Sequence, residues 1–162
     1  MKRQGAGFTL IELLVVIAII GILSAVVLAS LNTARTKGND AGIKANLNSV
    51  ETQAALYLLN NNSYGAFDNG SGGPAVCPVS GTSGATVFHD ATIEKAIAMA
   101  VSDAGGGGIT ACFANGTKYA AAVTRANQAS STYWCVDSTG TRCGVNSYLF
   151  VNGACPACAS AQ

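Results

Sequence analysis

The chain has 162 residues, of which 49% are hydrophobic and only 10% are charged, and its length supports one domain. Nine Lys and Arg residues against eight Asp and Glu residues leave a formal net charge of +1. This balance argues against a nucleic-acid protein that works through an extended basic surface, because neutralising phosphates requires clustered Lys and Arg.

The N-terminus joins a short basic segment to a long apolar one. Residues 1–7 are polar and carry Lys2 and Arg3, and the next 24 residues, Phe8 to Leu31, contain only four polar side chains. A helix of that length extends for about 36 Å, which exceeds the roughly 30 Å hydrocarbon core of a bilayer. The sequence therefore predicts a membrane-spanning helix here.

Glu12 does not fit a plain membrane anchor. An ionised side chain in hydrocarbon costs on the order of 2.5 to 3.5 kcal/mol on insertion scales. A position at the headgroup boundary lowers this cost through snorkelling and water, and this is the simplest interpretation of an isolated glutamate. Deeper in the apolar layer, Glu12 needs a partner of opposite charge.

The segment Gly7-Phe8-Thr9-Leu10-Ile11-Glu12 resembles the prepilin processing motif of type IV pilins and type II secretion pseudopilins. The following LLVVIAIIGIL resembles the N-terminal helix of that family, and the strong resemblance extends to about residue 60. It implies that a membrane-embedded prepilin peptidase cuts between Gly7 and Phe8 and N-methylates Phe8. It also implies that Glu12 meets the amine of a neighbouring subunit during assembly, where the opposite charge offsets desolvation.

The resemblance also implies a division of the chain and a function. Residues 1–7 are the expected leader peptide, residues 8–35 the hydrophobic transmembrane or filament-core helix, and residues 36–162 an extracytoplasmic head. The implied protein is a structural pilin, a homo-oligomer in a helical filament, with roles in adhesion, motility or DNA uptake, which leaves nucleic acid open as a partner. It begins as a single-pass precursor in the inner membrane and reaches an extracellular pilus or periplasmic pseudopilus through an inner-membrane assembly platform.

Other interpretations of the N-terminus remain open. A secretory signal peptide would use Lys2 and Arg3 as its basic region and Val27-Leu28-Ala29 as its cleavage site, but this pattern assigns no role to Gly7 or Glu12. An uncleaved anchor carrying an extracellular binding module is a further alternative. Within the filament class, a type II secretion-like pseudopilin shares all of these residues.

The apolar helix is expected to continue beyond the membrane span. Apolar residues recur at spacings of three and four, which predicts an amphipathic helix to about Leu59 that packs under a sheet; they are Ile43, Leu47, Val50, Ala54, Tyr57 and Leu58. The helix lacks the proline that the family often has near Ala29. Gly38 and Gly42 each weaken a helix by up to about 1 kcal/mol, so a bend is expected near residues 36–42.

The remaining sequence predicts an α+β head. A loop over residues 60–77 precedes a short helix at about 91–103, capped by Asp90 or Thr92. Asn115-Gly116 joins two β-prone segments into a hairpin, and two more strands are expected to complete a four-stranded antiparallel sheet on the helix. The four predicted strands are Ile109–Ala114, Thr117–Thr124, Ser131–Asp137 and Asn146–Val151.

Six cysteines, all beyond the apolar segment, favour disulfides and an oxidising compartment. The terminal C-x-x-C spacing also occurs in zinc sites, but a zinc site needs a second close pair or histidines. Six cysteines allow 15 pairings, and the preferred one follows neighbours in sequence. The preferred pairs are Cys77 with Cys112, Cys135 with Cys143, and Cys155 with Cys158.

No enzymatic constellation is evident, so no catalytic residue, metal or cofactor is expected. His89 is the sole histidine, and no serine or cysteine nucleophile motif surrounds it. Asp90, its neighbour, is explained more simply as a helix cap than as an orienting carboxylate. We therefore interpret His89 as a loop residue.

Overall fold

The computed structural model describes residues 7–68, 74–78, 84–126, 132–150 and 153–158. The chain divides into two compact units, residues 1–36 and 37–162. Helix α1 (Leu10–Asn61) contributes to both units and continues through Gly38 and Gly42. It ends close to the predicted position.

In the first unit, the described residues are a short non-helical segment followed by the initial part of α1. This part is rich in Ile and Val, whose branched side chains lower helix propensity in water. In an apolar environment the helix is favoured nonetheless, because it satisfies every backbone N–H and C=O internally. The polar hydroxyls of Thr33 and Thr36 also bond within the helix, to the carbonyls of Ala29 and Asn32.

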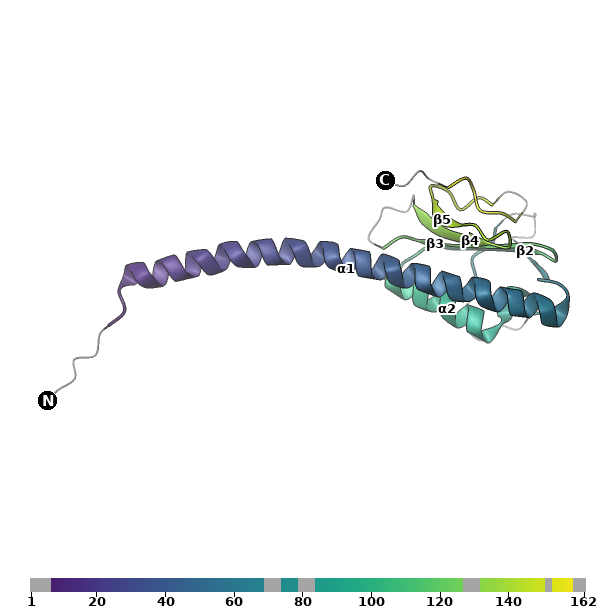
Figure 1. Cartoon of the computed structure of the whole chain (residues 1–162), viewed down its shortest axis with the longest axis horizontal. Helices are drawn as coiled ribbons and strands as arrows, with labels where there is room; N and C mark the ends of the chain where they lie inside the picture. Colours follow the sequence, from purple (N-terminus) through teal and green to yellow (C-terminus); the bar gives the residue numbers. More distant parts are fainter. Residues whose placement is uncertain (1–6, 69–73, 79–83, 127–131, 151–152, 159–162) are drawn as a thin grey trace. The chain divides into compact units, whose positions relative to one another are not determined.

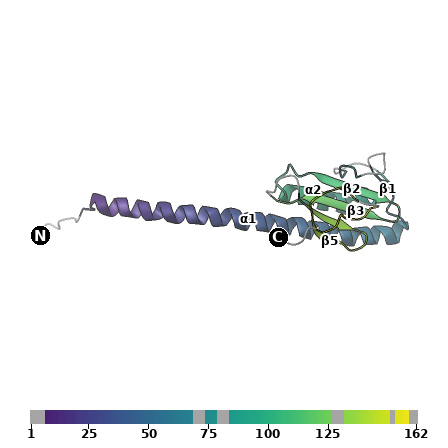
Figure 2. The same cartoon turned by 90° about the horizontal axis from the view of Figure 1, so that it is seen from above.

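The second unit is built on a five-stranded antiparallel sheet in which each strand pairs with the next along the chain. Figure 1 shows this sheet nearly edge-on, and Figure 2 shows its face. The three central and longest strands supply most of the pairing, including five register pairs between β2 and β3 and five between β3 and β4. The strands are β1 (Ala66–Phe67), β2 (Thr110–Asn115), β3 (Tyr119–Thr124), β4 (Tyr133–Asp137) and β5 (Arg142–Val145).

Helix α2 (Ala91–Asp103) and the second half of α1 cover one face of this sheet (Figure 2). The buried side chains of α1 follow the predicted spacing of four and three residues; they are Ile43, Leu47, Val50 and Ala54. They pack with α2 and with inward-facing strand residues such as Val123 in the main core. Full burial of each large aliphatic side chain contributes about 1.5 to 3 kcal/mol, so this stripe holds the helix on the sheet.

Helix α2 begins at the predicted cap. The carboxylate of Asp90 accepts hydrogen bonds from the backbone N–H groups of Thr92 (2.9 Å) and Ile93 (3.2 Å). The side chain of Gln53 on α1 donates to the same carboxylate at 3.2 Å. Asp90 therefore caps α2 and also ties it to α1. His89 ends a short 3-10 turn, η1 (Val87–His89), where its Nδ1 lies 2.7 Å from the Thr86 hydroxyl.

Gly42 lies where the two helices approach closely. A Cβ added there would lie 2.5 Å from a carboxylate oxygen of Asp103, and Asn46 donates to the same oxygen at 3.1 Å. The glycine therefore accommodates the end of α2. At Gly38 an added Cβ would meet nothing within 4 Å.

Two acidic residues on α1 connect the helix to the strands. Asp40 accepts from Arg125 (3.2 Å), from the backbone N–H of Ala126 (2.9 Å) and from the Trp134 indole (3.4 Å). Glu51 forms an ion pair with Arg142 on β5, with 2.7 Å between the nearest nitrogen and oxygen. Each contact is specific in direction, so together they fix the rotation of α1 under the sheet.

The strand boundaries differ from the prediction in the first hairpin. Three residues, Gly116 to Lys118, separate β2 from β3 instead of the predicted two, because the Asn115 side chain accepts from the Lys118 backbone (2.9 Å) and from the Thr117 hydroxyl (3.3 Å). Strand β3 consequently starts at Tyr119. Gly116 has a φ of 86°, which explains the glycine at this position.

The last predicted strand, Asn146–Val151, is wrong. The final strand is β5 (Arg142–Val145), which follows β4 after a tight turn with Gly140 at a φ of 84°. Residues 147–150 lie outside any strand, and Val151 lies outside the described residues, as does Ser131. The first strand, β1, and an isolated bridge between Ala75 and Cys112 fall in the segment predicted as a loop.

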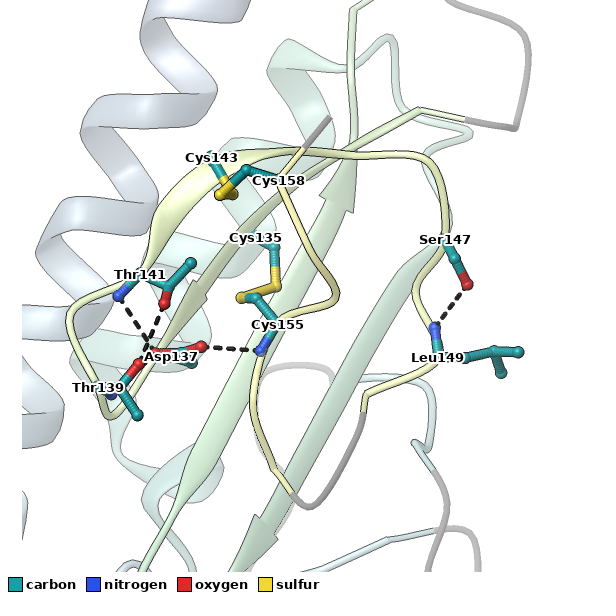
Figure 3. Close-up of a disulfide and its surroundings, with 9 residues drawn as sticks. All are labelled: Cys135, Asp137, Thr139, Thr141, Cys143, Ser147, Leu149, Cys155 and Cys158. Atoms are coloured by element: carbon teal, nitrogen blue, oxygen red, sulfur yellow. Dashed lines mark hydrogen bonds between the residues drawn. A yellow bond between two sulfur atoms is a disulfide. The ribbon is translucent and has the colours of Figure 1, made fainter. Parts of the chain in front are cut away.

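The three disulfides correct two of the preferred pairs. Cys77 is bonded to Cys112, as expected. Cys135 is bonded to Cys155, and Cys143 to Cys158, so the pairs Cys135–Cys143 and Cys155–Cys158 are wrong. The physical reason is tertiary: the C-terminal segment crosses the outer face of the sheet, and this places both of its cysteines over β4 and β5 (Figure 3).

Candidate functional site

The start of α1 carries a reciprocal hydrogen-bonded cap. Glu12 accepts from the backbone N–H and the hydroxyl of Thr9, both at 2.9 Å, and the Thr9 hydroxyl accepts from the Glu12 backbone N–H at 3.2 Å. This arrangement is a capping box, in which the residue before the helix and the third helical residue satisfy each other. Thr9 was not among the predicted site residues, although the spacing Thr-x-x-Glu is typical of this motif.

The capping box places the predicted cleavage site outside the helix. Gly7, Phe8 and Thr9 precede α1 and are exposed, with 83% of Phe8 accessible. A Cβ added at Gly7 would meet nothing within 4 Å. The bond between Gly7 and Phe8 therefore lies in non-helical, accessible backbone, which is the conformation that a protease requires.

The first part of α1 presents a continuous apolar surface. Its large apolar side chains, from Leu10 to Leu31, are between 47% and 86% exposed. By length and composition this part of the helix is apolar enough to cross a membrane. An exposed surface of this size in water would be strongly unfavourable, so it requires lipid or other apolar surfaces. Glu12 is the only carboxylate before Asp40.

Small residues recur along this apolar helix at intervals of four. Gly21, Ala25 and Ala29 therefore lie along one side of it, and an added Cβ at Gly21 would meet nothing within 4 Å. Such a stripe lets another helix backbone approach closely, which favours helix association in apolar surroundings.

A second polar centre lies at the disulfide-bonded end of the head, where Asp137 is almost fully buried (Figure 3). One carboxylate oxygen accepts from the Thr139 hydroxyl (2.6 Å), the Thr139 N–H (2.8 Å) and the Thr141 N–H (3.2 Å). The other accepts from the Cys155 N–H at 2.8 Å. Asp137 thus holds the β4–β5 turn and the C-terminal segment together.

Burial raises the pKa of Asp137. The hydrogen bonds from Thr139, Cys155 and Thr141 lower this pKa by more than burial raises it, so the pKa lies below its ordinary value. The ionised form is therefore the one that stabilises the fold. This contribution is complete above about pH 4, the ordinary pKa of an unfolded Asp, and is lost as the pH falls through the lower pKa of the folded state.

We expect Asp137→Asn to lower the free energy of unfolding by about 2 kcal/mol at neutral pH, because charged hydrogen bonds contribute more than neutral ones. Denaturant unfolding at several pH values measures this. The deficit should shrink below pH 4 as the wild-type carboxylate protonates. Thr139→Val removes one hydrogen-bond donor and keeps the carboxylate. The free energy of unfolding of this variant should therefore still fall as the pH is lowered. An equal deficit of Asp137→Asn at acidic and neutral pH would contradict the role of the charge.

The described residues contain no cluster of three or more His, Cys, Asp or Glu side chains that could hold a metal ion. A surface cavity of about 240 Å³ lies between α1 and strands β4 and β5. Lys44 and Trp134 line it and contact each other, with 3.9 Å from the Lys44 ammonium to the ring centre. His89 is not among its lining residues.

Known proteins with similar sequences are components of pili and secretion systems. Residues 2–28 match the family described as the prokaryotic N-terminal methylation motif. The chain is 35% identical over 114 residues to the type IV wide pilus major component PilA4 of Thermus thermophilus, which covers 59% of this chain and 87% of that protein.

Two similar proteins belong to secretion systems. The chain is 33% identical over 72 residues to the type II secretion system core protein G of Dickeya chrysanthemi, covering 44% of this chain and 47% of that protein. It is 35% identical over 69 residues to core protein G of Aeromonas hydrophila, covering 43% and 48%. The chain thus matches about half the length of these two relatives. No solved structure matches the chain.

Proposed function

The chain belongs to the type IV pilin and pseudopilin family, and we propose that it is a structural subunit of a type IV pilus or a related filament. The observation that carries this proposal is the exposed apolar helix that begins with the Thr9–Glu12 capping box directly after Gly7-Phe8. The similarity to a major pilus component over 87% of that protein's length supports it. The proposed role is structural and non-enzymatic.

Maturation is proposed to divide the chain into three parts. Prepilin peptidase removes residues 1–7 as a leader and methylates the new amine of Phe8. Residues 8–35 form the helix that lies first in the inner membrane and then in the filament core, and residues 36–162 form the extracytoplasmic head. Loss of Lys2 and Arg3 changes the net side-chain charge from +1 to −1.

Assembly is proposed to pair Glu12 with the amine of a neighbouring subunit. Both hydrogen bonds from Thr9 use the same oxygen, Oε2, and no described residue donates to Oε1. The carboxylate therefore retains acceptor capacity while it caps the helix. In the apolar filament core, an opposite charge on this carboxylate offsets the desolvation of both groups.

Movement from membrane to filament exchanges lipid contacts for contacts between helices of identical subunits. The small residues Gly21, Ala25 and Ala29 allow close helix packing there. We propose that an inner-membrane assembly platform carries out this transfer. The finished filament would serve adhesion, motility or DNA uptake, the last of which would bring nucleic acid to its surface.

The similarity to two core proteins of type II secretion supports a second candidate, a pseudopilin in a periplasmic filament. The pilus is preferred because the match covers 87% of the pilus component, whereas it covers only 47% of the Dickeya secretion protein. A membrane-anchored extracellular binding module remains a third candidate, which would need no subunit pairing at Glu12.

Intact mass and N-terminal sequencing of the protein from its native cell envelope test the proposal. We expect a 155-residue chain that begins at methylated Phe8. A start after Ala29 would indicate an exported soluble protein, and a start at Met1 a plain anchor; either result contradicts the proposal. Electron microscopy with labelled antibody then separates an extracellular pilus from a periplasmic filament.

A further inference from the structure

Cys135 has a close potential partner to which it is not bonded. It lies directly opposite Cys143 in the register of β4 and β5, and both belong to the cluster on the outer face of the sheet. Opposed residues of an antiparallel pair have Cα atoms about 4.5 to 5.5 Å apart, within the roughly 4.4 to 6.8 Å range of disulfides. The folded hairpin therefore has the backbone spacing for a Cys135–Cys143 bond, yet both cysteines are bonded to the C-terminal segment instead (Figure 3).

Chain connectivity favours the bond that is absent. Cys135 and Cys143 are eight residues apart, whereas Cys135 and Cys155 are separated by 20 and Cys143 and Cys158 by 15. Loop-closure entropy alone makes the short closure about fourfold more frequent than closure to Cys155. The β4–β5 turn also forms locally, through hydrogen bonds from Gly140 to Asp137 and from Asp137 to Thr141.

We propose that Cys135–Cys143 is the first disulfide of this region, formed when the two thiols give two electrons and two protons to an oxidised thiol–disulfide oxidoreductase, and that Cys155 then exchanges it. The Cys155 thiolate attacks the sulfur of Cys135, the Cys135–Cys155 bond forms, and Cys143 leaves as a thiolate that takes up a proton. This step involves no net oxidation. Cys143 and Cys158 then give two electrons and two protons to an oxidised dithiol partner, a thiol–disulfide oxidoreductase, and close the last bond.

Several contacts drive the exchange toward the observed pairing. The Cys155 N–H donates to the buried Asp137 carboxylate at 2.8 Å, and Cys155 packs against the outer cluster, as Phe150 does. Gly153, at a φ of 72°, lies so close to Phe113 that an added Cβ would be 2.9 Å from its ring. A Cys135–Cys143 bond would leave the C-terminal segment without its covalent attachment to the sheet. No disulfide would then hold the segment in the position in which these contacts form.

A time course of oxidation tests the proposal in the full chain. The reduced protein is oxidised in detergent micelles with oxidised and reduced glutathione, samples are alkylated in acid, and disulfide-linked peptides are identified by mass spectrometry. Trypsin cuts after Arg142, and chymotrypsin cuts at Tyr148 to Phe150, so peptides containing Cys135, Cys143 and Cys155 are separated. We expect Cys135–Cys143 to form about fourfold faster than Cys135–Cys155 and then to disappear.

Two matched variants show which cysteine of the C-terminal segment, Cys155 or Cys158, attacks the Cys135–Cys143 bond. Cys155→Ala should accumulate Cys135–Cys143 and leave Cys158 open to alkylation. Cys158→Ala should still form Cys135–Cys155 and leave Cys143 open to alkylation.

The Cys77–Cys112 bond is the internal control, which should form in one phase in every sample. Absence of Cys135–Cys143 from the wild-type time course would overturn the proposal, even if the variants were degraded. Equal amounts of this bond in both variants would also overturn it. The proposed filament function is tested at other residues and does not depend on the outcome.

Discussion

Filament yield should fall sharply when Glu12 is replaced by alanine, while membrane insertion and removal of residues 1–7 continue. Insertion depends on the apolar helix and cleavage depends on Gly7, and the substitution leaves both unchanged. In the filament core, however, the amine of the neighbouring subunit would lose its counter-ion. Removing one member of a buried ion pair costs about 3 kcal/mol or more, which corresponds to at least about a hundredfold in the association of subunits. Quantifying sheared filaments against total cellular protein measures this.

Glu12→Gln separates the charge of Glu12 from its role as a cap. Glutamine at the third helical position can still bond to the backbone N–H of Thr9, so the capping box persists without a negative charge. We expect this variant to assemble as poorly as Glu12→Ala. Thr9→Val gives the converse change, because it removes the hydroxyl cap and keeps the carboxylate. Wild-type yield from Glu12→Gln would refute pairing with the amine and leave helix capping as the function of Glu12.

Replacing Gly7 with leucine should leave most of the protein as unprocessed precursor in the membrane. The proposed peptidase would have to bind the backbone on both sides of the bond between Gly7 and Phe8, and a large side chain would displace that backbone. A displacement of about 1 Å at a reacting bond can reduce a rate on the order of a hundredfold. The fold should be unaffected, because a Cβ at Gly7 meets nothing within 4 Å. Immunoblotting of membrane fractions with pulse labelling follows the conversion.

Gly21→Leu is the matched control for this experiment. It makes the same substitution within α1, at a position where an added Cβ also meets nothing within 4 Å. Its processing should proceed at the wild-type rate, although its packing into filaments can change. Normal processing of Gly7→Leu would mean that a different protease acts, and slow processing of both variants would show an indirect effect on membrane insertion.

Much of the architecture could be predicted because it depends on neighbouring residues in the chain. The buried face of α1 follows from apolar side chains every three or four residues, and the start of α2 follows from one capping side chain, Asp90. The position of the Asn115-Gly116 turn was predicted correctly, but its length was not. The Asn115 side chain binds Thr117 and Lys118 and so keeps these two residues in the turn. Thr9 was missed although its signal is local.

The sequence by itself determined the apolar helix and the α+β character of the head, because each depends on the identity and spacing of residues close together. Only the tertiary structure decided the partners of Cys135 and Cys143, the contact at Gly42 and the burial of Asp137. These depend on the path of the C-terminal segment over the sheet and on the approach of α2 to α1. Cys135 was predicted to bond to the next cysteine in the sequence, Cys143, but long-range packing and the hydrogen bond to Asp137 bring Cys155 to it instead.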